Sequence, residues 1–119
     1  MRAIIVAGRN VHPHDIEWIM AYAHPGIRPQ GVAAFGLDGE ATETFVVAAE
    51  EARTRRWPAL ELQNAVRRAL WEKLELVPHD VWLLPPTGIP RTSSGKIQRF
   101  EVRRRYLESG IQAAVQAIP

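Results

Sequence analysis

One loop near the C-terminal end of the chain concentrates the residue types that could do chemistry. Residues 90–99 read Pro-Arg-Thr-Ser-Ser-Gly-Lys-Ile-Gln-Arg. Hydroxyl groups can hold a turn through local hydrogen bonds, and a glycine tolerates positive φ and close approach of backbone to a ligand. The residues that we expect to support the lysine in this way are Thr92, Ser93, Ser94 and Gly95. Lys96 itself offers a compact charge with three donors on a long stem, which suits binding of a phosphate or carboxylate.

The spacing of this loop excludes two familiar sites and leaves one ordinary interpretation open. A phosphate-binding P-loop needs G-x-x-x-x-G-K-[ST], but Gly88 is too far from Gly95 and Ile97 stands where a hydroxyl is required. A serine nucleophile is also disfavoured, because the G-x-S-x-G pattern is absent. From spacing alone, a solvated turn that carries one lysine remains the favoured interpretation.

The same ten residues resemble the last core motif of the adenylate-forming superfamily, which includes acyl- and aryl-CoA ligases, peptide-synthetase adenylation domains, luciferases and fatty acyl-AMP ligases. In that family the motif lies on a small C-terminal lid domain, and the lysine is catalytic for adenylation. The resemblance therefore assigns this role to Lys96. It also implies that ATP with Mg²⁺ is bound mainly by a large N-terminal adenylation domain of the same enzyme, so that the isolated chain is inactive.

A second segment carries the same resemblance near the N-terminus. The residues Gly8, Arg9 and Asn10, followed by Pro13 and Asp-Ile-Glu at 15–17, are similar to the loop after the interdomain hinge. In the family this loop lines the channel for phosphopantetheine, whereas the residues alone would favour a plain strand-to-helix turn. The family's hinge Asp or Lys would lie at about Met1 or Arg2, and neither matches.

Together the two segments are most similar to fatty acyl-AMP ligases. The resemblance then implies a fatty acid substrate and transfer of the acyl group to the phosphopantetheine of an acyl carrier protein, as in polyketide or lipopeptide biosynthesis. Two alternatives remain open. The chain could be the C-terminal domain of an acyl-CoA ligase or of a peptide-synthetase adenylation domain, or a non-catalytic interaction module with the same fold.

Composition narrows the class of protein further. The 119 residues are 46% hydrophobic and 24% charged, which is typical of one small globular domain. Absence of cysteine excludes disulfides and thiolate metal sites and fits a cytoplasmic location, and no apolar run is long enough to span a membrane. The four histidines lack the spacing of a metal site, so we expect no bound metal.

Hydrophobic patterning predicts the elements that position the loop. Apolar runs predict strands at 3–7, 31–37, 43–49 and 81–84, the middle two forming an antiparallel hairpin. Helices are predicted after Pro13, after Pro58, and from Arg99 to Leu107 with Gly110 as the C-terminal cap. The sequence thus predicts an α+β fold for residues 1–110, with a small sheet and about three helices sharing one core, and a tail or linker at 111–119.

Two charged clusters admit more than one interpretation. Glu50 and Glu51 follow an apolar strand, and we expect them to be its solvated end. The basic run Arg103, Arg104 and Arg105 could be a solvated helix face, an interface to the larger domain, or a docking patch for an acidic carrier protein. Binding of nucleic acid is disfavoured, because the net charge is only +2 and no aromatic-interleaved basic motif accompanies the run.

Overall fold

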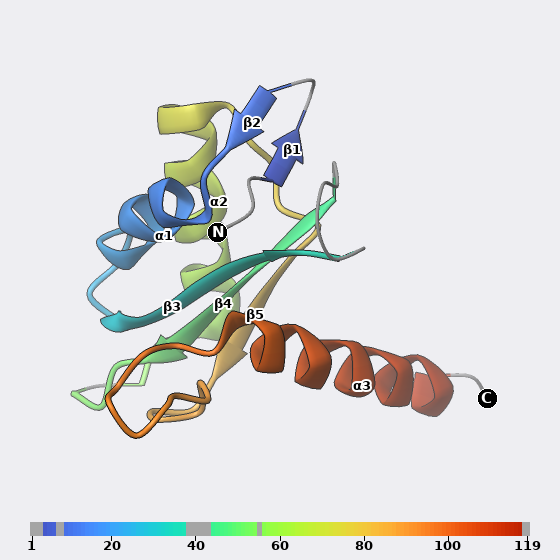
Figure 1. Ribbon diagram of the computed structural model, residues 1–119. Coiled ribbons are helices and arrows are strands. Elements are labelled where there is room, and N and C mark those ends of the chain that lie inside the picture. The colour runs from blue at the N-terminus through green and yellow to red at the C-terminus, as the bar shows by residue number, and fades with distance from the viewer. Residues whose placement is uncertain (1–3, 7–8, 38–43, 55, 118–119) are drawn as a thin grey trace.

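The computed structural model describes residues 4–6, 9–37, 44–54 and 56–117. They form a three-layer α+β fold in which a central sheet lies between helices, as Figure 1 shows. In chain order the elements are β1 (Ile4–Val6), β2 (Arg9–Val11), α1 (Pro13–Ala21), β3 (Ile27–Gly36), β4 (Phe45–Glu51), α2 (Ala59–Leu74), β5 (Asp80–Leu84) and α3 (Arg99–Ala117). The predicted fold class, a small sheet with three helices, is confirmed.

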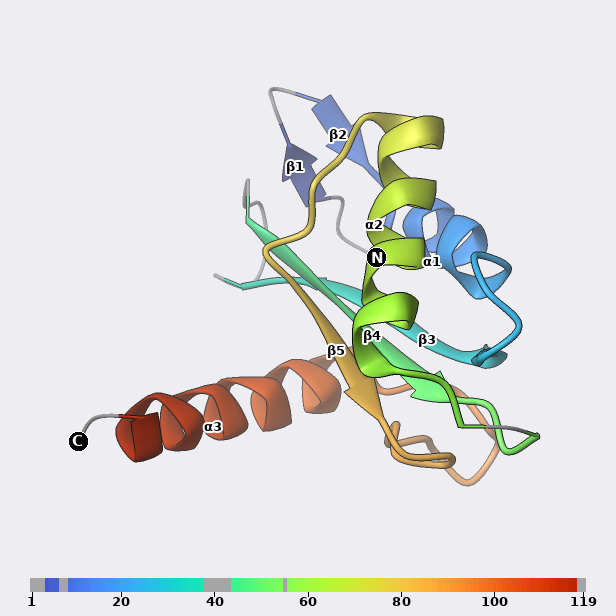
Figure 2. The same ribbon diagram turned by 180° about the vertical axis from the view of Figure 1, so that it is seen from behind.

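The central sheet has the strand order β3-β4-β5. The predicted β3–β4 hairpin is antiparallel, whereas β5 pairs parallel to β4 after the crossover through α2. Helices α1 and α2 cover one face, and α3 lies against the other (Figures 1 and 2). The prediction of a single shared core was wrong, because the buried side chains form two clusters, one on each face of the sheet. A sheet covered on both faces has apolar residues at consecutive positions, and all six residues from Phe45 to Glu50 are buried.

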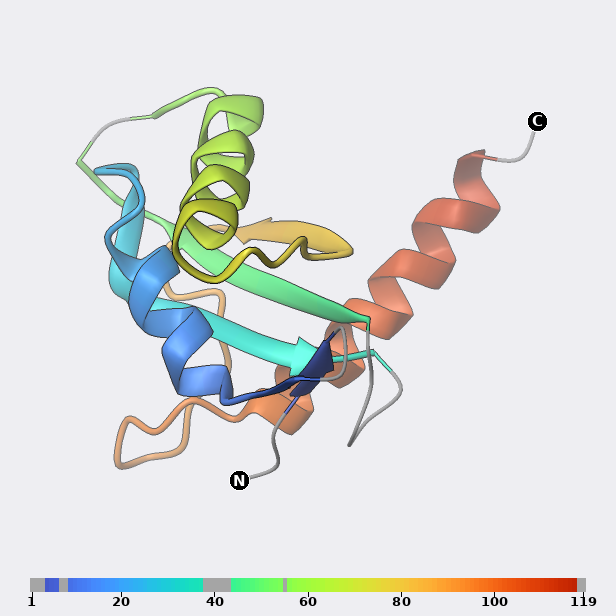
Figure 3. The same cartoon turned by 90° about the horizontal axis from the view of Figure 1, so that it is seen from above.

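Two predicted boundaries also differ from the structure. Residues 9–11 form β2, which pairs antiparallel with β1 in a separate two-stranded sheet, and not the expected loop. Helix α3 continues through Gly110 to Ala117, so Gly110 is not its cap. A glycine inside a helix costs only about 1 kcal/mol relative to alanine, and the alanines and glutamines that follow favour the helix. Figure 3 shows the later turns of α3 extending beyond the sheet.

None of the helices in the described ranges combines the length and apolar character needed to cross a bilayer.

Candidate catalytic lysine loop

Lys96 comes directly after the tip of a small hairpin between β5 and α3. Arg91 and Ile97 pair as an antiparallel bridge, and the Thr92 amide donates to the Lys96 carbonyl at 2.8 Å. The Gly95 amide in turn donates to the Thr92 carbonyl at 2.9 Å. Three-residue hairpin loops commonly close with a glycine at positive φ, and Gly95 has a φ of 90°. The glycine is therefore needed at this position for its backbone conformation.

Hydroxyl groups of Thr92 and Ser94 make hydrogen bonds within this turn. Thr92 Oγ1 accepts a hydrogen bond from the Lys96 amide at 3.1 Å and lies 3.1 Å from Ser94 Oγ. Ser93 and Ser94 are exposed beside it. The backbone of the lysine is thus fixed by Thr92 through both its main chain and its side chain.

The Lys96 side chain is exposed, and none of the described ion pairs or hydrogen bonds uses its ammonium group. The chain has only one other lysine, Lys73, which is exposed on α2. Lys96 therefore combines a fixed backbone with a free charge, the arrangement that delivery of a cation to another molecule requires.

A buried glutamate on the sheet anchors the N-terminal arm of the hairpin. Glu50 of β4 is 0% exposed, and its Oε2 accepts a hydrogen bond from the Ile89 amide at 2.9 Å. Its Oε1 accepts from Arg28 Nη1 at 2.8 Å and lies 3.9 Å from Arg91 Nη2. The expectation that Glu50 belongs to a solvated strand end was therefore wrong. The cause is the loop after β5, which covers this end of β4.

A bulge in β3 makes room for the Glu50 carboxylate. The register of β3 against β4 shifts between Ile27 and Val32, and Gly31 lies in this irregular stretch. A Cβ at Gly31 would lie 2.3 Å from Glu50 Oε1, which is closer than side-chain atoms can approach. The Gln30 carbonyl of the same stretch accepts a hydrogen bond from Arg91 Nη2 at 2.6 Å. The bulge thus leaves space for the Glu50 carboxylate and supplies the carbonyl that binds Arg91 of the hairpin.

A second glutamate anchors the C-terminal arm. Glu17 of α1 is 8% exposed, and its Oε2 accepts from Arg99 Nε at 2.7 Å while its Oε1 pairs with Arg99 Nη2. Glu17 Oε2 also accepts from the Ala34 amide of β3 at 2.8 Å. Among the described residues, Glu17 and Glu50 are the two buried charged side chains, and each fixes one arm of the lysine hairpin.

No protein-family model matches the chain. The medium-chain-fatty-acid–[acyl-carrier-protein] ligase JamA of Moorena producens is 35% identical over 107 residues, which are 88% of this chain and 18% of that protein. A solved structure from a study of fatty acyl-adenylate ligases of E. coli and L. pneumophila is 27% identical, with a TM-score of 0.70, over 94% of this chain and 20% of that one. The McyG A-PCP structure with phenylalanyl-adenylate is 20% identical and has a TM-score of 0.80 over 97% of this chain and 18% of that one.

The chain corresponds to the C-terminal part of adenylate-forming ligases. It spans about a fifth of the length of the curated relatives that it matches. Those relatives include fatty-acid–AMP ligases and a putative acyl-CoA synthetase. The resemblance seen in the two sequence segments is therefore confirmed over most of the chain.

The described part of the other predicted site segment lies away from the lysine loop. Gly8 lies outside the described residues, and Arg9 and Asn10 belong to β2, where Asn10 is exposed. The views in Figures 1 and 2 place the β1–β2 hairpin and the lysine loop at opposite ends of the molecule. The structure therefore does not bring the two predicted groups of site residues together in one site.

The three consecutive arginines of α3 have different surroundings. Arg103 is held against the end of β3, where its Nε donates to the Gly36 carbonyl at 3.0 Å and its Nη2 to the Leu37 carbonyl at 2.6 Å. It is thus engaged in holding α3 on the sheet. Arg104 and Arg105 have side chains that are about half exposed, 49% and 50%.

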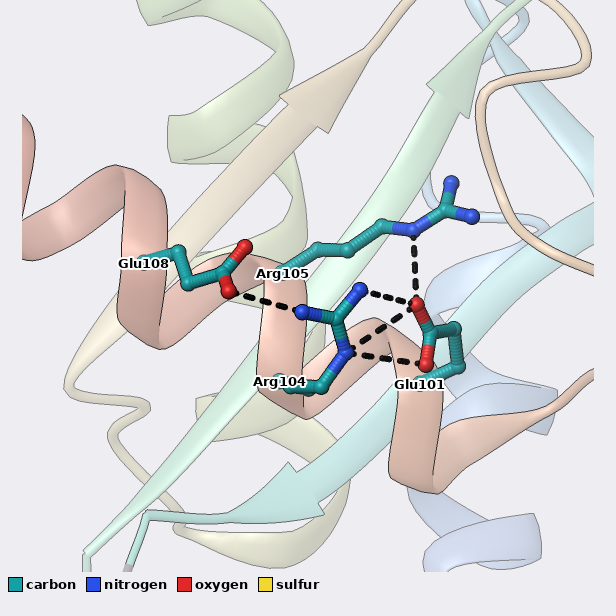
Figure 4. Close-up of polar contacts among 4 residues, drawn as sticks. All are labelled: Glu101, Arg104, Arg105 and Glu108. Atoms are coloured by element: carbon teal, nitrogen blue, oxygen red, sulfur yellow. Dashed lines mark hydrogen bonds and ion pairs between the residues drawn. The ribbon is translucent and has the colours of Figure 1, made fainter.

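These two exposed arginines form a network with carboxylates of the same helix, shown in Figure 4. Arg104 pairs with Glu101 at 2.5 Å and with Glu108 at 2.7 Å, and Arg105 Nε lies 3.1 Å from Glu101 Oε1. Hydrogen bonds from Arg104 and then Arg105 lower the pKa of Glu101 to about 2. The positive charge of this face is therefore partly compensated by its own helix.

No group of three or more His, Asp or Glu side chains in the described part of the chain is arranged to hold a metal ion.

Sequence reasoning did not identify Glu17 and Glu50, although each left a signal. Glu17 lies on the stripe of α1 that also holds the buried Pro13 and Met20, and Glu50 continues the buried run of β4. A carboxylate in an apolar stripe requires a partner when it is buried. Their partners Arg99 and Ile89 are 82 and 39 residues away, so the sequence alone did not reveal them.

Proposed function

We propose that this chain is the mobile C-terminal domain of a fatty acyl-AMP ligase and that Lys96 is its catalytic residue for adenylation. The observation that carries the proposal is the free, exposed ammonium of Lys96 on a hairpin whose two arms are anchored by Glu50 and Glu17. Relatives described as fatty-acid–AMP ligases and as a fatty-acid–[acyl-carrier-protein] ligase support this choice of substrate class.

In this reaction a fatty acid carboxylate attacks the α-phosphorus of ATP. A carboxylate oxygen forms the new bond to phosphorus, the bond from the α-phosphorus to its bridging oxygen breaks, and pyrophosphate leaves with that electron pair. Both reactants are anionic, and charge accumulates on the α-phosphoryl oxygens in the transition state. A cation placed between them offsets the repulsion and favours in-line geometry, and Lys96 has the reach for this role. ATP and Mg²⁺ would be held mainly by the large N-terminal domain.

The second half-reaction transfers the acyl group from the adenylate to the thiol of a carrier protein's phosphopantetheine, which releases AMP. We propose that the segment Gly8, Arg9 and Asn10 lines the channel for this arm. The β1–β2 hairpin, which contains Arg9 and Asn10, lies at the opposite end of the molecule from the lysine loop, and this supports a domain that rotates between the two steps and presents a different end in each. Arg104 and Arg105 would dock the acidic carrier, whereas Arg103 is already engaged with backbone carbonyls.

The test joins this chain to the large domain of a fatty acyl-AMP ligase and measures pyrophosphate release. Lys96→Ala should lower the rate of acyl-AMP formation by about 10²–10³-fold, equivalent to about 3–4 kcal/mol for one well-aimed donor. Lys73→Ala is the matched control, because it removes the only other lysine from an exposed position on α2. An unchanged rate in Lys96→Ala would dismiss the catalytic role, and pyrophosphate release by the chain alone would contradict its proposed dependence on the large domain.

The second candidate function is that of an acyl-CoA ligase, because one relative is named a putative acyl-CoA synthetase. The molecule that accepts the acyl group distinguishes the two candidates. Acyl transfer to a phosphopantetheinylated carrier protein should exceed transfer to free CoA. Charge reversal at Arg104 and Arg105 should weaken that transfer and spare acyl-AMP formation. Equal losses in both steps would count against carrier docking at this face.

A further inference from the structure

Glu50 is a buried carboxylate to which the proposed chemistry assigns no role. It is fully buried on β4, on the same sheet face as Val46 and Ala48, and it makes its hydrogen bonds to groups outside its own strand. We propose that Glu50 is a positioning residue that sets the orientation of the Lys96 hairpin through Arg91 and the Ile89 amide. The inference rests on the proposed adenylation function of Lys96.

A continuous set of contacts connects Glu50 to the lysine. Ile89 donates its amide directly to the carboxylate, and the Arg91 guanidinium lies 3.9 Å from Glu50 Oε1. The same guanidinium donates to the Gln30 carbonyl at 2.6 Å and makes a longer contact of 3.5 Å with the Gly95 carbonyl. Gly95 immediately precedes Lys96. Arg91 is thus held at the sheet and touches the turn from which the lysine projects.

The physical case is that the carboxylate keeps two groups of the hairpin in fixed places. Without its charge, the buried Ile89 amide loses an ionised acceptor and the Arg91 guanidinium loses its buried counter-ion. The hairpin then samples more orientations relative to the sheet. Because an error of 1 Å in placing a catalytic group can lower a rate by roughly 10²-fold, looser anchoring reduces adenylation even when Lys96 is present.

Arg28 provides a matched comparison within the same cluster. It also donates to Glu50 Oε1, at 2.8 Å, but it belongs to β3, and none of its described hydrogen bonds or ion pairs is with residues 89–97. Removing the Arg28 guanidinium therefore perturbs the Glu50 carboxylate without cutting its connection to the hairpin.

The first measurement is amide hydrogen exchange on the chain itself. In Glu50→Gln, exchange at Thr92, Gly95 and Gln98 should rise at least about tenfold, while Ala33 and Ala48 in the sheet stay as in the wild type. Arg91→Gln should give the same local result, and it keeps the Glu50–Arg28 pair in case Glu50→Gln does not fold. Unchanged loop exchange in Arg91→Gln, an equal rise in the sheet, or the same loosening in Arg28→Gln would overturn the proposal.

The second measurement uses the ligase that contains this domain and separates positioning from general stability. Arg91→Gln and Glu50→Gln should lower kcat for acyl-AMP formation by about 10–100-fold, while acyl transfer from a supplied acyl-AMP stays unchanged. Equal losses in the two steps would show a merely structural role. If Lys96→Ala does not change the rate of acyl-AMP formation, the proposed function fails. The exchange data report only on the anchoring of the hairpin, so the two failures can be told apart.

Discussion

Replacing Gly31 by alanine should destabilise the domain by about 2–5 kcal/mol, because the new methyl group competes for space with the Glu50 carboxylate. The added Cβ would lie 2.3 Å from Glu50 Oε1 and 2.6 Å from its Cδ. The φ of Gly31 lies outside the left-handed region, so alanine can adopt the backbone conformation and the cost comes from the contact.

The magnitude follows from three contributions. Overpacking a well-packed site costs about 1–3 kcal/mol. Displacing the carboxylate weakens charge-assisted hydrogen bonds to Ile89 and Arg28, each worth about 1.5–3 kcal/mol, and at least one of them must lengthen. Alanine also restricts the conformations of the unfolded chain relative to glycine, which stabilises the folded state by about 0.4–1 kcal/mol.

Denaturant-induced unfolding of a double-mutant cycle checks this reasoning. Gly31→Ala should lower the free energy of unfolding more in the presence of Glu50 than in a Glu50→Ala background, where the carboxylate is gone and only the 2.8 Å contact with the Cβ of residue 50 remains. The two substitutions should therefore be non-additive by about 1–3 kcal/mol. A Gly31→Ala protein within about 0.5 kcal/mol of the wild type, or an additive cycle, would refute the proposed packing of the carboxylate in the β3 bulge.

Three further predictions concern the lysine loop and α3. Gly95→Ala should lower stability by about 1–2 kcal/mol in denaturant unfolding, because Gly95 has a φ of 90° with open space around it, and no loss would contradict that conformation. The pairing of Glu101 with Arg104 should stabilise the fold above about pH 4.5 and be lost as the pH falls towards 2, since the pKa of Glu101 is lowered from 4.5 to about 2. An NMR titration of the Glu101 carboxyl checks this, and a midpoint near 4.5 would contradict it. Burial, followed by the hydrogen bond to Asp80, raises the pKa of Tyr106 from 10.0 to about 12. The stability that the protonated Tyr106 gives the folded state is therefore fully present below pH 10 and is lost as the pH rises through 12. Asp80→Asn should move the ultraviolet titration of tyrosinate partly back towards 10, and an unchanged midpoint would exclude a role for Asp80.

Local sequence determined most of the elements, whereas the candidate catalytic group was identified by the resemblance of residues 90–99 to a family motif. Prolines and glycines delimit the lysine loop, and 3.6-residue periodicity placed α1, α2 and the start of α3. Apolar runs placed the β3–β4 hairpin and β5. These features depend on residues that are neighbours along the chain, so pattern and turn chemistry are sufficient to predict them.

Only the tertiary structure decided how the lysine is held. Glu50 reads locally as the polar end of a strand, and it became an anchor because the loop at Ile89 folds over it from 39 positions away. Glu17 similarly meets Arg99 across 82 positions. A carboxylate can be buried only where groups distant in the sequence form hydrogen bonds or ion pairs with it, and local periodicity contains no information about those groups.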